Sequence, residues 1–239
     1  MAAGRGVTSA RVAAELRSRI ERGELLPEDR LPSERELSES LHTTRVTSRE
    51  ALKQLEAEGL IYRSNRRGWF VTSQRINYNP SRAAFFMDYV ADQGLVPFSR
   101  QLLKKRIVAD DRLASMLEVS VKAPLVELQR LRGANGRPAY IETIYLPEGR
   151  LPGIYECDLE RSVSAVMLGD YDQQYAVVEL DITVGALSAG QAALLDAPPG
   201  YTCLCVRRVV RNAAGEVVEY DLEHWRHDSL NIQVRLDNS

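Results

Sequence analysis

The chain has 239 residues, of which 44% are hydrophobic and 27% are charged, and these values exclude a disordered or fibrous protein. The formal net charge is −2, yet residues 1–75 hold 14 Lys and Arg against 11 Asp and Glu, which leaves the rest of the chain at −5. No apolar run approaches the roughly 20 residues of a membrane-spanning helix. The length favours two domains.

Cysteine and histidine residues give no metal or catalytic pattern. Three cysteines and no signal peptide predict a reducing, cytoplasmic setting rather than a disulfide scaffold. Cys203 and Cys205 share one face of a predicted strand, as core cysteines do, whereas His224 and His227 face opposite sides. Phosphate loops, nucleophile elbows and metalloprotease motifs are missing from the sequence. We therefore expect no enzyme activity and no cofactor.

Apolar residues at helical spacing predict three helices in the first 60 residues. The first covers residues 9–22. The second begins at Ser33, whose distance from Glu36 along the chain is that of a capping box. The third begins after Thr44, a good helix cap, and we expect Val46 on its apolar face.

A β-hairpin is predicted directly after the third helix. Residues 60–63 and 69–72 are short β-prone runs, and the polar segment between them contains glycine. Three helices and a hairpin form the outline of a winged helix-turn-helix, which we assign to residues 1–75. Residues 76–81, rich in Asn and Pro, are expected to be a linker.

The start of the third helix has the chemistry of a DNA-reading surface. Arg45 and Arg49 lie four residues apart and project from one face, beside the hydroxyls of Thr44 and Thr47. Arginine forms bidentate hydrogen bonds with guanine in the major groove. Arg35, at the start of the second helix, is a further candidate. A solvated helix end is the alternative, but the helix dipole disfavours arginine there without a nearby anion.

The predicted hairpin tip carries Arg66, Arg67 and Gly68. A wing of this composition can contact phosphates or the adjacent minor groove. A solvated turn would have the same composition. The order helix, turn, helix, wing favours the DNA-binding interpretation for all of these residues together.

A family resemblance rests on these same segments. The motifs are Leu31-Pro32-Ser33-Glu34-Arg35-Glu36-Leu37, Thr44-Arg45, Arg49-Glu50-Ala51-Leu52, Leu55-Glu56-Ala57-Glu58-Gly59-Leu60 and Arg67-Gly68. They closely resemble the DNA-binding domain of the GntR family. The resemblance implies that Arg35, Arg45, Arg49 and Gly68 contact operator DNA. Two departures are Arg66, where the family usually has glycine, and Ser48, where it usually has valine, which costs some core packing.

The remainder of the chain, residues 82–239, alternates strands with a few helices. The helices are expected near 82–93, 111–117, 159–168 and 188–195, and the strands near 101–108, 125–133, 138–146, 175–186, 202–212, 216–227 and 230–236. Strands dominate, so we expect an α+β domain with a mainly antiparallel sheet.

Two arginines in this domain indicate an anion site. Arg130 and Arg132 lie two apart in a strand and point to one face. Burying them is costly unless an anion or carboxylate meets them, and a water-facing edge strand is the alternative. A strict two-residue turn at Asn135-Gly136 would put Glu142 on the opposite face, and a β-bulge would reverse that parity. The sequence leaves both arrangements open.

A second resemblance covers most of residues 80–236. Its motifs are Leu125, Arg130-Leu131-Arg132, Gly136-Arg137-Pro138, Glu142, Tyr145-Leu146-Pro147, Pro152-Gly153, Asp158-Leu159, Val218-Glu219-Tyr220 and Asp228. They resemble the UTRA ligand-sensing domain of the HutC branch, which is similar in fold to chorismate lyase. The resemblance implies that Arg130 and Arg132 hold an anionic group, that Glu142 and Glu219 hold a polar or cationic part, and that Ser162 adds a hydroxyl.

Other positions indicate that the ligand differs from that of relatives. Trp225 stands where those relatives often have an aromatic hydroxyl, and Ser81 and Arg82 could supply replacement anion contacts. A phosphorylated sugar, a phosphonate or an organic acid would suit an arginine pair.

Together these features predict an effector-responsive regulator of transcription, a repressor that binds double-stranded operator DNA as a homodimer. Two alternatives remain at this point. One is a chorismate-lyase-like enzyme fused to a DNA-binding domain, and the other is a second domain that only dimerises.

Overall fold

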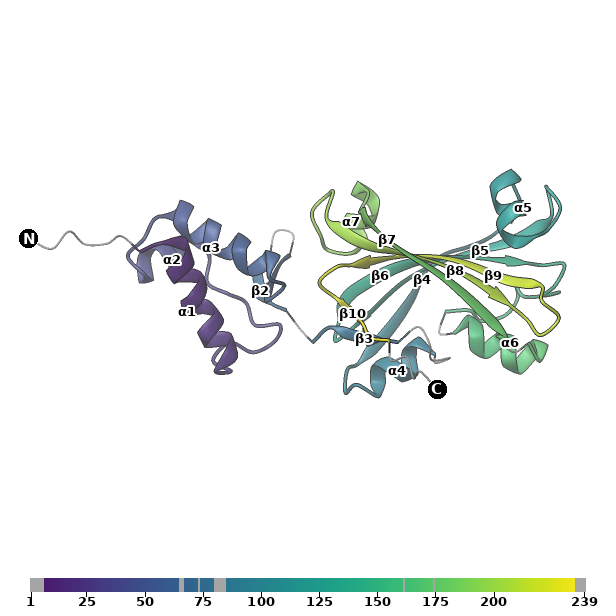
Figure 1. Cartoon of the computed structure of the whole chain (residues 1–239), viewed down its shortest axis with the longest axis horizontal. Helices are drawn as coiled ribbons and strands as arrows, with labels where there is room; N and C mark the ends of the chain where they lie inside the picture. Colours follow the sequence, from purple (N-terminus) through teal and green to yellow (C-terminus); the bar gives the residue numbers. More distant parts are fainter. Residues whose placement is uncertain are drawn as a thin grey trace, which may run out of the picture. The chain divides into compact units, whose positions relative to one another are not determined.

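The computed structural model of the chain describes residues 7–64, 67–72, 74–79, 85–160, 162–173 and 175–234. The chain divides into two compact units, Met1–Arg75 and Ile76–Ser239, and each is described on its own (Figure 1). Within the described ranges, every helix is too short or too polar to cross a lipid bilayer.

The first unit is a helical domain with a small hairpin. Its elements are α1 (Ser9–Glu21), α2 (Glu34–Ser40), α3 (Arg45–Ala57), β1 (Ile61–Ser64) and β2 (Gly68–Val71). The two strands pair antiparallel, with Ile61 opposite Val71. Leu16, Leu37 and Leu55 form a common core with Trp69 of the hairpin. This is the predicted winged helix-turn-helix.

The caps of α2 and α3 are the predicted ones. Both hydrogen bonds of the Ser33–Glu36 capping box are present, and the Thr44 hydroxyl accepts from the backbone N–H of Thr47 at 3.1 Å. The prediction for Val46 is wrong, because its side chain is 63% exposed. The buried stripe of α3 begins instead at Ser48 and continues with Ala51, Leu52 and Leu55, at the spacing of one helix face.

The second unit is built on one large sheet. Its elements are β3 (Ile76–Tyr78), α4 (Phe86–Ala91), β4 (Pro97–Val108), α5 (Asp111–Leu117), β5 (Pro124–Ala134), β6 (Arg137–Pro147), α6 (Val163–Tyr171), β7 (Val177–Ala186), α7 (Ala189–Leu194), β8 (Thr202–Arg211), β9 (Val217–Arg226) and β10 (Leu230–Ile232). Six strands form an antiparallel sheet in the order β4-β5-β6-β9-β8-β7. The α+β class with a mainly antiparallel sheet is confirmed.

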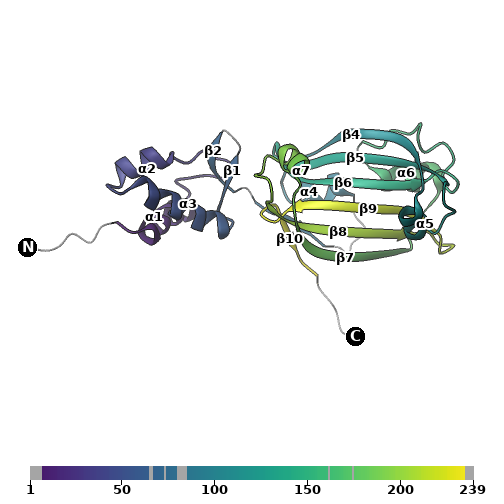
Figure 2. The same ribbon diagram turned by 90° about the horizontal axis from the view of Figure 1, so that it is seen from above.

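Helices cover both faces of this sheet. Helices α5 and α7 lie over one face, and α4 and α6 lie over the other (Figures 1 and 2). Leu131 and Ile141 pack with α7 on the first face. Ile144 packs with α6, and Tyr140 packs with α4, on the second face. The parity of each strand therefore decides which side chains meet beneath α4 and α6.

The segment expected as a linker differs from that expectation. Residues Ile76–Tyr78 form β3, which pairs in parallel with β10 at the other end of the unit. Ile76 is buried against Leu230 in the cluster under α4. Three residues are too few for a strand pattern to show in the sequence, and the partner strand lies some 150 residues away. Residues 80–84, which include Ser81 and Arg82, lie outside the described ranges.

Candidate functional site

The N-terminal ends of α2 and α3 carry the arginines predicted to read DNA. Arg45 and Arg49 are exposed on the first two turns of α3. Arg49 donates to Glu34 of α2 at 2.8 Å, so an ion pair joins the two helix starts. Arg35, the next residue of α2, is exposed and pairs with Glu39 at 3.1 Å. The structure thus places the three arginines at two neighbouring helix starts.

The protein itself supplies an anion to one of the arginines at the helix starts, because Glu34 pairs with Arg49. Hydrogen bonding from Arg49 lowers the pKa of Glu34, so this carboxylate is ionised at neutral pH and balances Arg49 in the free protein. Within the described ranges, Arg45 makes no ion pair. The dipole argument for a missing anionic partner therefore rests on Arg45, whereas Arg49 already has Glu34 as its anionic partner.

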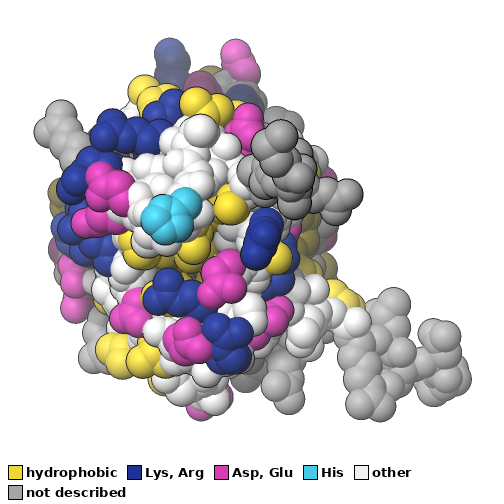
Figure 3. Space-filling model, turned by 90° about the vertical axis from the view of Figure 1, so that its left-hand side faces the viewer, with side chains coloured by type: hydrophobic (Ala, Val, Ile, Leu, Met, Phe, Trp, Pro, Cys, Tyr) yellow, Lys and Arg dark blue, Asp and Glu magenta, His cyan; other side chains and the backbone are white. Residues whose placement is uncertain are grey.

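Thr44 and Thr47, the two threonines of this surface, have a structural role at the start of α3. The hydroxyls of Thr44 and Thr47 lie 2.9 Å apart, and Thr44 caps α3. On the face seen from the left of Figure 1, Lys and Arg side chains alternate with Asp and Glu side chains (Figure 3). Basic and acidic side chains are thus intermixed on the face seen in this view.

The wing is described only in part, because Arg66 lies outside the described residues. Arg67 is exposed, and its guanidinium lies 5.2 Å from the centre of the Phe70 ring. Gly68 adopts a φ of 107°, a conformation that side chains disfavour. A Cβ at Gly68 would lie 3.4 Å from Nε of Arg30. Glycine is therefore required here by the backbone.

In the second unit, a β-bulge decides the arrangement that the sequence left open. Asn135 and Gly136 both have positive φ, as in a two-residue hairpin turn. The register then shifts, so that Arg132 lies opposite Tyr140 and Arg130 lies opposite Glu142. Both arginines and Glu142 therefore share the sheet face beneath α4 and α6.

These three side chains form a buried charged group. Nε of Arg130 lies 2.5 Å from Oε1 of Glu142, and Nε of Arg132 lies 2.7 Å from the same oxygen. Arg130 also donates to the carbonyl of Leu159, and the Arg132 guanidinium lies over the ring of Phe86. Burial opposes ionisation of Glu142, but the charges of Arg130 and Arg132 hold its pKa below the ordinary value. The group therefore carries two positive charges and one negative charge.

A second charged group lies beside the first, and the sequence analysis had singled out only one of its members, Glu219. Glu219, Asp221 and Glu223 alternate along β9 and are all buried. Nη2 of Arg208, on β8, lies 2.6 Å from Asp221, 3.3 Å from Glu223 and 3.7 Å from Glu219. Three acids at alternate positions of an apolar strand were the available signal, since such a row must share one face.

Asp221 has the most perturbed ionisation of this group. Burial, together with the neighbouring carboxylates of Glu223, Glu142 and Glu219, raises the pKa of Asp221 well above its ordinary value despite the opposing charge of Arg208. Carboxylate oxygens of Glu142, Asp221 and Glu223 lie within 4.8 Å of one another, a spacing at which a cation could be held.

Trp225 belongs to an aromatic wall beside these acids. Its ring stacks on Tyr140 at 3.7 Å and on Tyr78 at 6.3 Å, and its indole N–H donates to Glu223 at 2.6 Å. Burial and the charge of Glu223 raise the pKa of Tyr78 to about 12. The wall therefore presents neutral rings, and its one described N–H, that of Trp225, is directed at Glu223.

The remaining predicted residues have partners within the protein. The Ser162 hydroxyl accepts from the backbone N–H of Ala165 at 3.0 Å and caps α6. Glu219 accepts from the Tyr175 hydroxyl. Glu219 lies on the sheet face covered by α6, since Val210, which lies opposite it in β8, packs under that helix.

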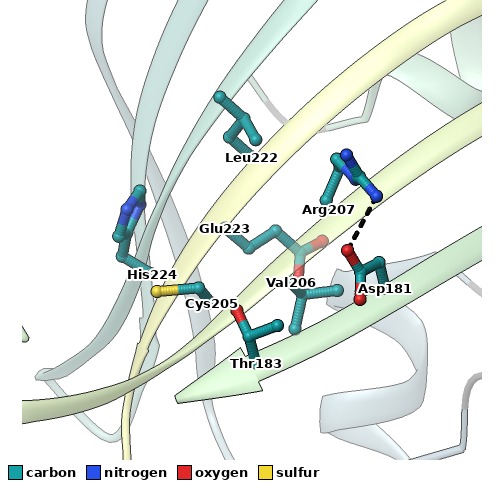
Figure 4. A pocket seen from close by; sticks show the side chains of 8 residues that line it. All are labelled: Asp181, Thr183, Cys205, Val206, Arg207, Leu222, Glu223 and His224. Atoms are coloured by element: carbon teal, nitrogen blue, oxygen red, sulfur yellow. Dashed lines mark hydrogen bonds and ion pairs between the residues drawn. The ribbon is translucent and has the colours of Figure 1, made fainter. Parts of the chain in front are cut away.

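A hollow of about 190 Å³ is lined by residues of β7, β8 and β9, among them Glu223 of the second charged group. Asp181 and Arg207 form an ion pair on one side of the hollow, and Cys205 and His224 lie on the other side (Figure 4). Cys205 and His224 lie opposite each other at strand positions that alternate with those of the acids, so their side chains point to the other face of the sheet. None of the side chains proposed from the sequence as effector contacts lines this hollow.

Sequence comparisons bear on both units. The sequence model described as bacterial regulatory proteins, gntR family, matches residues 8–71, and that of the UTRA domain matches residues 92–231. The uncharacterized HTH-type transcriptional regulator YihL of Escherichia coli is 32% identical over 215 residues, which cover 88% of this chain and 89% of YihL. The HTH-type transcriptional repressor NagR of Bacillus subtilis is 26% identical over 231 residues, covering 95% and 93% of the two chains.

The fold is similar to that of a solved relative. The crystal structure of PhnF from Mycobacterium smegmatis superimposes with a TM-score of 0.68 at 24% identity and covers 95% of this chain and 100% of PhnF. The matched proteins are transcriptional regulators and not enzymes, which excludes the enzyme alternative. The chain therefore belongs to the GntR family of bacterial regulators, in the HutC branch, where a helix-turn-helix that binds DNA is joined to a UTRA effector-binding domain.

Proposed function

We propose that the chain is a repressor whose affinity for operator DNA is controlled by a small anionic metabolite bound at Arg130 and Arg132. The observation that carries this proposal is the geometry of their group, where two buried guanidinium groups lie against the same oxygen, Oε1 of Glu142. Buried charges are costly unless they are balanced, and a phosphate, phosphonate or carboxylate group would balance them through paired hydrogen bonds.

Repression is supported by the descriptions of relatives. NagR of Bacillus subtilis is described as a repressor, and so is MngR of Escherichia coli, the repressor of a mannosyl-D-glycerate transport and metabolism system. We further propose that Arg35, Arg45 and Arg49 read operator bases or phosphates, with Thr44, Thr47 and the Arg66-Arg67-Gly68 wing beside them. Ser162, Glu219, Trp225, Ser81 and Arg82 are the additional candidates for effector contacts.

A homodimer is part of this proposal, because one recognition helix covers only one half-site of a palindromic operator. The outer strand β7 offers a surface for a second copy, since Val177, Val178 and Val184 are exposed there and an unpaired apolar edge favours pairing. Effector binding would then favour an arrangement of the two helix-turn-helix units that no longer matches the half-site spacing. Sedimentation showing a monomer at micromolar concentration, both free and on DNA, would contradict the dimer.

A ligand screen tests the effector. We expect phosphorylated sugars, phosphonates or organic acids to raise the thermal transition of the full chain and to weaken its binding to DNA fragments selected from a random pool. The variant Arg132→Ala is expected to keep DNA binding and to lose the response. If no anion in the screen alters either quantity, a second unit that only dimerises is the better interpretation.

A further inference from the structure

We propose that the effector carries a positively charged amine next to its anionic group, and that Asp221 and Glu223 bind this amine. The inference rests on the proposed function, since it concerns the same ligand site. It adds two residues and a chemical class of ligand to that site.

The sheet brings the acids to one place beside the arginine group. Glu142 of β6 lies opposite Glu223 of β9, and Asp221 is two residues along the same face. Asp221 in turn lies opposite Arg208 of β8. Glu142 belongs to both groups, because its Oε1 binds Arg130 while a carboxylate oxygen lies within 4.8 Å of those of Asp221 and Glu223. An anion site and an acidic site are thus adjacent.

The hydrogen bonds in the acidic site leave one buried oxygen without a partner. Glu223 accepts from the indole N–H of Trp225, and Oδ2 of Asp221 accepts from Arg208 at 2.6 Å. Within the described part of the chain, Oδ1 of Asp221 has no partner, although this residue is 0% exposed. A buried polar atom without a partner is costly, and a ligand that donates a hydrogen bond would remove that cost.

The balance of charge favours a cation as this donor. Arg208 faces three carboxylates at once, those of Glu219, Asp221 and Glu223. Even when Glu142 is assigned wholly to the arginine group and Asp221 keeps the proton that its raised pKa favours, the carboxylates of Glu219 and Glu223 outnumber the charge of Arg208 by one. A bound ammonium group would supply this missing positive charge and would favour the ionised form of Asp221. The fold alone gives no reason for a third acid on this face, because an apolar residue of similar size would pack there without cost.

An ammonium group suits the geometry of these oxygens. A nitrogen that donates to oxygens at about 2.8 Å in tetrahedral directions spans oxygen atoms about 4.6 Å apart, within the limit of 4.8 Å for Glu142, Asp221 and Glu223. A divalent metal ion would face the guanidinium of Arg208, which already binds the same carboxylates. Since the two sites share Glu142, the amine and the anion of the ligand are separated by a short linker.

Calorimetry with matched compounds tests this inference on the full chain. The probes are 2-aminoethyl phosphate, which has both groups, and ethyl phosphate, which lacks the amine. We expect 2-aminoethyl phosphate to bind about tenfold more tightly or better, the gain of one hydrogen bond between charged groups. In Asp221→Asn this ratio should fall towards one, while the affinity for ethyl phosphate is unchanged. Asp181→Asn, an exposed acid paired with Arg207, is the control and should keep the ratio.

The outcomes separate this inference from the proposed function. If ethyl phosphate binds as tightly as 2-aminoethyl phosphate, the amine site is wrong and the anion site stands. If Asp221→Asn keeps the full ratio, Asp221 is not the amine contact and the inference is also wrong. If Mg²⁺, Ca²⁺ or Mn²⁺ alone raises the thermal transition and Asp221→Asn abolishes the effect, the acids bind a metal instead. If neither phosphate compound binds at millimolar concentration, both the inference and the anion site fall.

Discussion

Nε of Arg130 lies 2.5 Å from Oε1 of Glu142, and neither residue is more than 2% exposed. The same oxygen also meets Arg132 at 2.7 Å. One carboxylate oxygen therefore contacts two buried guanidinium groups. The stability of the second unit and the affinity of its anion site are consequently linked at Glu142.

Replacing Glu142 by Gln keeps the size of the side chain and removes the charge. We expect the free energy of unfolding to fall by about 3–5 kcal/mol, because two buried guanidinium groups lose their counter-charge. Urea denaturation of the full chain measures this. Inorganic sulfate should restore part of the loss, since an anion can replace the carboxylate. Asp181→Asn removes an exposed partner and should cost less than about 1 kcal/mol. A loss that small in Glu142→Gln would contradict the buried group.

Arg45 and Arg49 should differ from other arginines of the first unit in DNA binding. Arg45→Ala or Arg49→Ala should each weaken binding to a selected operator fragment by about 1–3 kcal/mol and relax sequence preference. Arg17 is the matched control, because it pairs with Glu58 on the far end of α3. Fluorescence anisotropy measures the three affinities. Equal losses in all three variants would mean that only net charge matters.

Ser48 is a position where the first unit can be stabilised. Ser48 is 0% exposed, and its hydroxyl has no hydrogen-bond partner in the described ranges. Ser48→Val should raise the free energy of unfolding by about 1 kcal/mol, because a desolvated hydroxyl is replaced by apolar volume. Scanning calorimetry should show the first unit melting about 4–8 °C higher. Ser48→Ala removes the hydroxyl alone and separates the two causes. A lower melting temperature for both variants would contradict this prediction.

Asp221 should make stability depend on pH in an unusual direction. Its pKa is raised by burial and by the carboxylates of Glu223, Glu142 and Glu219, with Arg208 opposing, so the folded chain holds a proton that the unfolded chain loses above about pH 4. The free energy of unfolding therefore falls as the pH rises from about 4 to the raised pKa of Asp221 in the folded chain.

Asp221→Asn removes this dependence. The variant should be close to the wild type in stability near about pH 4 and should gain on it by about 1.4 kcal/mol for each pH unit above, until the folded carboxyl ionises. Urea denaturation over a pH series measures the difference. A difference that stays constant with pH would show that Asp221 is ionised in the folded chain.

Local chemistry explains what could be predicted from the sequence. The capping residues Ser33 and Thr44 act on neighbours three residues away, so their roles are visible in short motifs. The faces of Arg130 and Glu142 depended instead on a single extra residue in β6. Gly133 permits that bulge, because a Cβ there would lie 2.0 Å from the carbonyl oxygen of Arg137. A register shift of this kind has no periodic signal.

The acidic site shows a second limit. Glu219, Asp221 and Glu223 were visible as an alternating row, but their partner Arg208 comes from another strand. Pairing between distant segments cannot be read from one sequence. For the same reason the sequence predicts a linker where the structure has β3.

Strand β3 joins the start of the second unit to the aromatic wall beside the acidic site. The chain leaves the first unit at Arg75 and three residues later reaches Tyr78, whose ring stacks on Trp225, the residue that donates to Glu223. The residues that follow the DNA-binding unit therefore pack, through Tyr78, against the aromatic wall beside the acidic site. A ligand that moved Glu223 would therefore reach the residues that follow the DNA-binding unit through only two side chains, Trp225 and Tyr78.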